Sequence, residues 1–223
     1  TIVELCKKGI SARKILTKEA IRNAVKVTMA ICGSTNAVLH LPAIANEAEL
    51  DINVLEEFEK LSKITPQIAK VNPAAKPDME AFFRAGGIPR VMQNLGGLLD
   101  TSVMTVTGKT LQENLDAYVY EYPEDSSIIK TVEAPFSRTG GVAVLHGNLC
   151  PNTAVSKPGA IAPAMHRFVG KAKCYNSEED AEEAILSGKI AAGDVVVIRY
   201  EGPKGGPGMR EMFKAMKYIY GVG

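Results

Sequence analysis

The sequence predicts an α+β protein, with a helical first half and a second half that mixes short strands with helices. Through most of the first hundred positions, apolar residues recur every three or four residues, the period of an amphipathic helix. From Asp100 onward they come in short β-branched runs separated by turns that contain Gly and Pro, which is typical of strands. We therefore expect a boundary near residue 100, with one domain segment over residues 1–100 and another over residues 101–223.

Cap and breaker residues divide the first half into helices. Thr17, followed by Glu19, starts a helix that extends to about Ala30, because Thr is a favoured N-cap residue and acidic side chains favour the first turn. Prolines and the Gly86-Gly87 pair interrupt the pattern further along. Four more helices are expected, at residues 37–48, 54–61, 79–84 and 88–99.

The second half contains strand candidates and three helices. Ser177 with Asp180 reads as a capping box, and its helix extends to Ser187 because Gly188 suits the position after a helix end. A short helix follows Thr110, and a last one is expected over residues 209–220. Strands are expected at residues 103–106, 128–129, 141–145, 169–175 and 195–198.

Composition excludes several classes of protein. The 223 residues are 46% hydrophobic and 23% charged, which is too apolar for a disordered chain. The 26 basic and 25 acidic residues leave a net charge of +1, so a broad nucleic-acid surface is not expected. No apolar run approaches 18 residues, so no membrane span is expected. None of the four cysteines lies within four residues of another, which favours reduced thiols and a cytoplasmic location.

The strongest local feature is a buried strand at 195–198 that leads to Glu201 and a Gly/Pro-rich loop, Gly202–Gly208. Such a loop before a helix can present backbone N–H groups to an anion, and a carboxylate at a strand end can bind a hard cation such as Mg²⁺. The loop is not a Walker motif, because no Gly-Lys-Ser/Thr closes it. A tight turn that needs glycine for positive φ explains the same residues.

A second feature, Ser34-Thr35-Asn36, lies between two expected helices and follows Cys32. These side chains can cap a helix, or they can bind a ligand carboxylate at its positive end. Cys32 could be a metal ligand or a buried thiol, and the absence of a neighbouring cysteine favours the buried thiol. Two single residues are further candidates for a functional site. His146 ends an expected strand and could point into a site, and Arg84 could pair with a ligand carboxylate.

Five segments in register resemble the dihydroxy-acid and sugar-acid dehydratase family along nearly the whole chain. They are GSTNAVLHL at 33–41, RAGGIP at 84–89, TVTGKTL at 105–111 with Glu113-Asn114, GNLCP at 147–151, and GDVVVIRYE at 193–201 with its continuation to Met212. The resemblance implies the helical end of an N-terminal α/β domain, followed by an incomplete, β-barrel-like, swivelling C-terminal domain. It also implies a hydro-lyase that converts a 2,3-dihydroxy carboxylate to a 2-keto acid.

In that family an iron–sulfur cluster acts as Lewis acid on the leaving hydroxyl, and Mg²⁺ holds the substrate. By resemblance, Glu201 is the Mg²⁺ ligand. The substrate-binding residues implied are Ser34, Thr35, Asn36, Gly205, Gly206 and Met209. The family's cluster cysteines lie upstream of the resembling region, and its catalytic serine follows the position of Gly223. No catalytic residue is therefore expected in this chain. Cys32 also stands where the family usually has Gly, and Phe83 where it usually has His.

We therefore expect a fragment of a larger cytoplasmic, homodimeric enzyme of branched-chain amino-acid biosynthesis, inactive and without a cluster when alone. A start without Met and an end just after a helix fit a fragment, although a processed Met and a short natural end fit as well. The expected partner is a small dihydroxy acid, with no nucleic acid and no membrane. A sugar acid, such as an aldonate or phosphogluconate, is the alternative substrate. A non-catalytic remnant that binds anions at Gly202–Gly208 is the alternative function.

Overall fold

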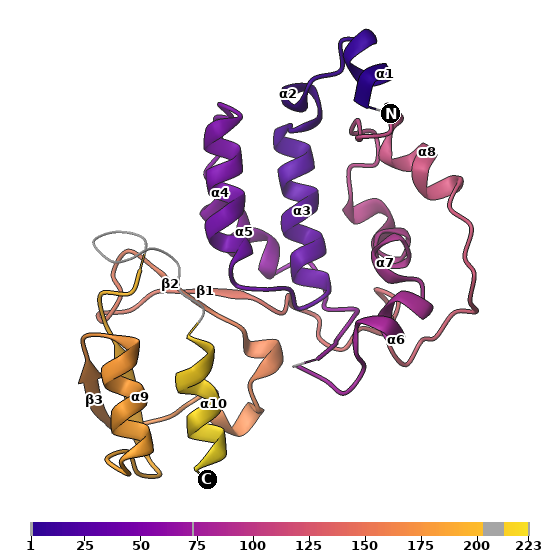
Figure 1. Cartoon of the computed structure of the whole chain (residues 1–223). Coiled ribbons are helices and arrows are strands. Elements are labelled where there is room, and N and C mark those ends of the chain that lie inside the picture. The colour runs from indigo at the N-terminus through magenta and orange to yellow at the C-terminus, as the bar shows by residue number, and fades with distance from the viewer. Residues whose placement is uncertain (1, 73, 203–211, 223) are drawn as a thin grey trace. The chain divides into compact units, whose positions relative to one another are not determined.

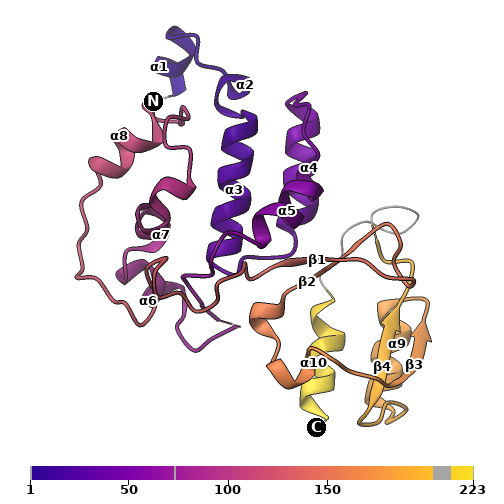
Figure 2. The same ribbon diagram turned by 180° about the vertical axis from the view of Figure 1, so that it is seen from behind.

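The chain forms two compact units, unit 1 (Thr1–Pro163) and unit 2 (Ala164–Gly223) (Figures 1 and 2). The computed structural model describes residues 2–72, 74–202 and 212–222. Helices and two small sheets are both present, so the α+β class is confirmed. Among the described residues, no helix is long and apolar enough to cross a membrane.

Unit 1 is built mainly from helices whose starts follow the expected cap chemistry. The Thr17 hydroxyl accepts a hydrogen bond from the Ala20 N–H, and Thr110 and Glu113 form a complete capping box. The helices are α1 (Ile2–Lys7), α2 (Ala12–Ile15), α3 (Lys18–Ala30), α4 (Ala37–Glu47), α5 (Val54–Ser62), α6 (Met79–Arg84), α7 (Gly87–Leu95) and α8 (Leu111–Asp116). Short 3₁₀ turns occupy Gly96–Leu98, Pro158–Ala160 and Pro163–Met165.

Helix α3 is the centre of unit 1, because two of its faces are buried in two different apolar clusters. Val27 and Ala30 join a cluster with α6, α7 and the segment around Ile68. Val25 and Met29 join another, which contains Phe58 of α5. The buried Asn23 side chain both donates to and accepts from the Asp100 backbone, so the chain is anchored to α3 where the expected boundary lies.

A close backbone approach joins the later part of unit 1 to the end of α3. Strands β1 (Ala143–Leu145) and β2 (Ala154–Ser156) pair antiparallel, with Val144 opposite Val155. Just before β1, the Gly141 N–H donates to the Met29 carbonyl at 3.0 Å. A Cβ at Gly141 would lie 2.5 Å from Cys32 Cα, so only glycine fits there. This approach fixes β1 against the helical core.

Unit 2 is a small βαβ arrangement with one added helix. The parallel strands β3 (Lys171–Tyr175) and β4 (Asp194–Ile198) pair over their whole lengths, and α9 (Glu178–Leu186) connects them. Helix α10 (Phe213–Gly221) packs against α9. Ser177 caps α9 by accepting the Asp180 N–H at 3.1 Å, as expected.

The differences from expectation lie mainly in the strands. The runs at 103–106 and 128–129 are not strands: each makes a single isolated bridge, Met104 with Thr110 and Ile129 with Ala69. Strand β2 and helices α1 and α2 were not anticipated. The β-barrel is not confirmed: the described residues hold two two-stranded sheets, too few strands to close one. The proposed division near residue 100 stays a prediction.

Candidate functional site

The Ser34–Asn36 segment is positioned by the way α3 ends. The Gly33 N–H bonds to the Thr28 carbonyl at 2.8 Å, and the Cys32 N–H bonds to the Met29 carbonyl at 3.3 Å. This is a Schellman motif with Cys32 in the left-handed position at φ 51°. A non-glycine residue there costs about 1 kcal/mol, which explains why the resembling family usually has glycine at this position.

The Cys32 side chain is enclosed where the Gly141 and Gly159 backbones approach it. Its Sγ donates to the Gly141 carbonyl at 3.6 Å, and a Cβ at Gly159 would lie 2.7 Å from the sulfur. Burial raises the pKa of this thiol, while the charges of Lys157 and Lys70 act in the opposite direction. The thiol therefore stays protonated at neutral pH and is a packing group, not a thiolate ligand or nucleophile.

Ser34, Thr35 and Asn36 start α4, but their backbone does the capping. The first N–H groups of the helix bond to the carbonyls of these three residues, and Asn36, at the N-cap position, makes no side-chain cap bond. The Ser34 hydroxyl is exposed and accepts the Asn36 N–H at 3.2 Å. The Ser34 hydroxyl therefore caps the chain just before α4, and backbone carbonyls accept the first N–H groups of the helix itself.

Two lysines add positive charge to this region, and the sequence reasoning missed both. Lys70 and Lys157 lie far apart in the chain, yet both charges act on the Cys32 thiol. Both side chains belong to half-buried residues. No local motif singles them out, since their proximity to Cys32 depends on the fold of unit 1. Cationic groups beside a polar helix start favour an anionic ligand.

In unit 2, Glu201 follows β4 and is buried, with 6% of its surface exposed. Its Oε1 accepts the Glu178 N–H at 2.9 Å, so the carboxylate lies at the N-terminal end of α9. Tyr200, just before it, has φ 64°, which turns the chain sharply after the strand. The Glu201 carboxylate thus caps a helix, where the helix dipole favours a negative charge.

Glu201 is the one metal ligand that the resemblance implies for this chain. Glu201 is a hard oxygen donor and fits one ligand position for Mg²⁺, which commonly takes one or two carboxylates plus substrate oxygens. Within the described ranges, no three His, Cys, Asp or Glu side chains gather as a metal site. The four thiols are scattered, with Cys32 buried and Cys6 and Cys174 exposed, so they do not fit an iron–sulfur cluster. Gly205, Gly206 and Met209 lie outside the described residues.

The two other open candidates have surface partners. His146, just after β1, lies 3.2 Å from Glu59, and this contact is the main cause that lowers the Glu59 pKa. Arg84 pairs with Glu80 at 2.7 Å, one turn earlier on α6. Both contacts join exposed side chains, so Arg84 has a surface ion pair and His146 has a surface carboxylate partner.

Comparison with known proteins decides the family. The N-terminal model of the dihydroxy-acid/6-phosphogluconate dehydratases matches residues 1–114, and the C-terminal model matches residues 127–223. The chain belongs to this family. Proteins named dihydroxy-acid dehydratase match along all of it: 48% identical in Methanococcoides burtonii, 49% in Nitratidesulfovibrio vulgaris (strain DP4) and 50% in Caldanaerobacter subterraneus subsp. tengcongensis. The chain spans about 40% of the length of these relatives.

Proposed function

We propose that this dehydratase-family chain is part of a hydro-lyase that converts a branched-chain 2,3-dihydroxy carboxylate to a 2-keto acid. The observation that carries the proposal is the 48–50% identity to proteins named dihydroxy-acid dehydratase over the full 223 residues. A sugar acid is the second candidate substrate, because the matched family also includes 6-phosphogluconate dehydratases. The whole protein would be a cytoplasmic homodimer.

The residues of unit 1 would bind the substrate. Ser34, Thr35 and Asn36 offer hydroxyl and amide groups at the start of α4. Lys70 and Lys157 make the surroundings of this segment positive, which favours the carboxylate of a dihydroxy acid. Ser34 would orient a substrate hydroxyl by a hydrogen bond, since its own hydroxyl is exposed.

In unit 2, the family resemblance implies a metal ligand and a substrate-contacting loop. Glu201 would provide a carboxylate ligand for Mg²⁺, and the loop residues Gly205, Gly206 and Met209 would contact the substrate. Bound Mg²⁺ would neutralise the negative charge that develops on the substrate when its C2 proton leaves. The iron–sulfur cluster and the catalytic serine would belong to parts of the protein outside this chain. In the whole C-terminal domain, a β-barrel-like, swivelling fold would hold Glu201 and this loop.

The test uses the protein translated from the complete reading frame. A branched-chain 2,3-dihydroxy acid and an aldonate are compared as substrates by the rate of 2-keto acid formation. We expect the branched-chain acid to have the higher kcat/KM, and a preference for the aldonate would select the sugar-acid alternative. Iron and sulfide analysis accompanies the assay. No turnover of either acid by protein that contains the cluster would refute the proposed reaction.

Variants test the residue roles separately. Glu201→Gln should weaken Mg²⁺ activation and lower kcat, because an amide is a poorer ligand for a hard cation. Ser34→Ala should raise KM more than it lowers kcat. The 223-residue chain alone should bind no cluster and show no turnover. Unchanged Mg²⁺ dependence in Glu201→Gln would remove this residue from the site, and turnover by the chain alone would refute the fragment hypothesis.

A further inference from the structure

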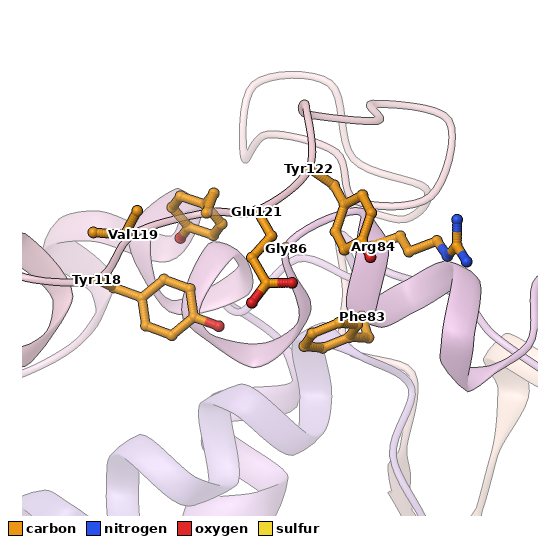
Figure 3. A pocket seen from close by; sticks show the side chains of 8 residues that line it. Phe83, Arg84, Gly86, Tyr118, Val119, Glu121 and Tyr122 are labelled. Carbon is orange, nitrogen blue, oxygen red and sulfur yellow. The ribbon is translucent and has the colours of Figure 1, made fainter.

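A small pocket in unit 1 is lined by aromatic side chains and one carboxylate (Figure 3). The segment Tyr118–Tyr122, which follows α8, passes beside the end of α6 and the Gly86 turn. Tyr118, Tyr120 and Tyr122 come from this segment and Phe83 from α6. The cavity measures about 40 Å³. Such a volume holds a group of roughly two or three heavy atoms.

The rings are held in place by contacts among themselves. Phe83 and Tyr122 meet edge to face at 6.2 Å between ring centroids, and Tyr118 and Tyr120 do so at 4.9 Å. A Cβ at Gly86 would lie 3.0 Å from the Tyr120 ring, so glycine is required beneath that ring. The Tyr120 hydroxyl donates to Gln93 Oε1 at 2.7 Å. The pocket walls are therefore fixed before any ligand arrives.

Two ring faces already hold cations of this chain. The Arg90 guanidinium lies 3.8 Å from the Tyr120 centroid, and the Arg84 guanidinium lies 5.2 Å from that of Tyr122. Arg84 also pairs with Glu80, and Figure 3 shows its guanidinium directed away from the pocket. Tyr118 and Phe83 are 41% and 54% exposed, and no cation of the described residues lies over either ring.

The Glu121 carboxylate supplies negative charge at these two exposed rings. In Figure 3 it points toward the space between Tyr118 and Phe83. In the part of the chain that the structure describes, this carboxylate makes no ion pair and no hydrogen bond. Aromatic faces and a carboxylate around one small space attract a positive group and repel an anion.

We propose that this pocket binds an alkylammonium group, the end of a lysine side chain or of a free primary amine. The Tyr118 and Phe83 rings would contact the methylene next to the nitrogen, and Glu121 would accept a hydrogen bond from the ammonium. The cavity suits this compact group better than a planar guanidinium. This inference goes beyond the proposed function, because none of the residues implied for substrate or metal binding lines this pocket.

The test titrates the 223-residue chain with n-butylammonium chloride at constant ionic strength, with aromatic NMR signals as the readout. We expect saturable shifts of the Tyr118 and Phe83 signals with a dissociation constant in roughly the millimolar range. Neutral n-butanol, which has a similar shape, should bind about tenfold more weakly, because it forms neither the cation–π contact nor the ion pair. Equal shifts with n-butanol would overturn the proposal.

Glu121→Gln should weaken n-butylammonium about fivefold, because it removes the charge and keeps the side-chain size. The matched control is Glu124→Gln, which removes a carboxylate from the same segment but outside the pocket lining. It should change the affinity less than twofold. Equal effects of the two variants would refute a specific pocket, since only net charge would then matter.

The source of the ammonium is distinguished by sedimentation equilibrium of the same variants. If it is a lysine of a second copy, the chain self-associates, and Glu121→Gln weakens that association while Glu124→Gln does not. If it is a free amine, Glu121→Gln leaves any self-association unchanged and only the n-butylammonium titration responds. A chain that neither self-associates through Glu121 nor binds n-butylammonium would refute both sources.

Discussion

Units 1 and 2 differ in what fills their interiors. Unit 1 buries large apolar side chains such as Phe58, Met29 and Ile68 in two clusters around α3. In the described part of unit 2, the buried apolar residues are Ile185 and three alanines, and two carboxylates, Glu178 and Glu201, are buried beside them. Burial of large apolar side chains is the main source of stability, so unit 1 should be the more stable of the two.

The candidate residues of unit 1 and those of unit 2 differ in a similar way. In unit 1 the Ser34–Asn36 segment lies between α3 and α4, with the Ser34 hydroxyl outside the core. In unit 2 the candidate metal ligand Glu201 is itself buried and caps α9. The proposed ligand binding and the stability should therefore be separable in unit 1, whereas in unit 2 both would depend on the Glu201 side chain.

The largest expected effect comes from the core of unit 1. Phe58 is fully buried, and Phe58→Ala should lower the free energy of unfolding by about 3–5 kcal/mol through lost burial and a cavity. Urea unfolding followed by circular dichroism measures it. Lys60→Ala, on the exposed side of the same helix, should stay within about 0.5 kcal/mol of the parent. A loss below about 1 kcal/mol for Phe58→Ala would contradict a tightly packed core.

In unit 2, a smaller loss in the free energy of unfolding should be enough to unfold the whole unit. Ile185→Ala should cost about 2–4 kcal/mol, and because Ile185 is the large buried apolar residue described there, unit 2 should open while unit 1 stays folded. Hydrogen exchange of the α9 and α3 amides separates the units. Leu186→Ala, at a side chain 59% exposed, is the control. Loss of protection in both helices together would show that the units unfold as one.

The dual role of Glu201 is tested by comparing it with Ser34. Glu201→Ala should destabilise unit 2 by about 1–3 kcal/mol, because the buried Glu178 N–H loses a charged acceptor. Ser34→Ala should change the stability of unit 1 by less than about 0.5 kcal/mol. Thermal unfolding monitored by hydrogen exchange measures both. A stable Glu201→Ala protein would mean that the carboxylate is dispensable for the fold.

The smallest expected effect depends on pH. The hydrogen bond from Lys173, at 2.7 Å, lowers the pKa of the Asp194 carboxyl below its ordinary value, with a further contribution from the Ala191 N–H. Because the pKa of Asp194 is lower in the folded than in the unfolded state, its ionised carboxylate stabilises unit 2 at pH values above the unfolded-state pKa of about 3.9. This stabilisation is lost as the pH falls through the folded-state pKa. Asp194→Asn should therefore lower the melting temperature at pH 7 but not near pH 2.

The control for this pH effect is Asp51→Asn, at a fully exposed carboxylate in unit 1. It should show no such pH-dependent difference. If Asp194→Asn and the parent differ equally at both pH values, the Lys173 contact does not act through the charge of Asp194. Both partners reach the surface, so solvent screens the pair and the effect stays small.

Helices were predictable from the sequence because their signals are local. Thr17 and Ser177 cap α3 and α9 as their spacing indicated. Strands were less predictable, because pairing depends on distant partners. Strand β2 exists because Val155 pairs with Val144 of β1, whereas the β-branched pair Ile128-Ile129 finds only one bridge.

The family resemblance named Ser34–Asn36 and Glu201 as candidate site residues, and their roles stay predictions. The resemblance did not reveal that the Glu201 carboxylate caps α9, since that contact joins residues 23 positions apart. Nor did it reveal Lys70 and Lys157, whose charges meet at Cys32 only after folding. Local patterns thus identified individual groups, while their electrostatic partners required the three-dimensional arrangement.

The tight approach of Gly141 to Cys32 restricts where the genes of two family members can recombine and still give a well-packed protein. The two family models divide the chain between residues 114 and 127, but unit 1 extends to Pro163. Recombination between relatives at the model boundary would bring Gly141 and Gly159 from one parent against Cys32 from another. Because a Cβ at Gly141 would lie 2.5 Å from the Cys32 backbone, the two sides must remain compatible. A crossover after Pro163 would transmit this contact intact.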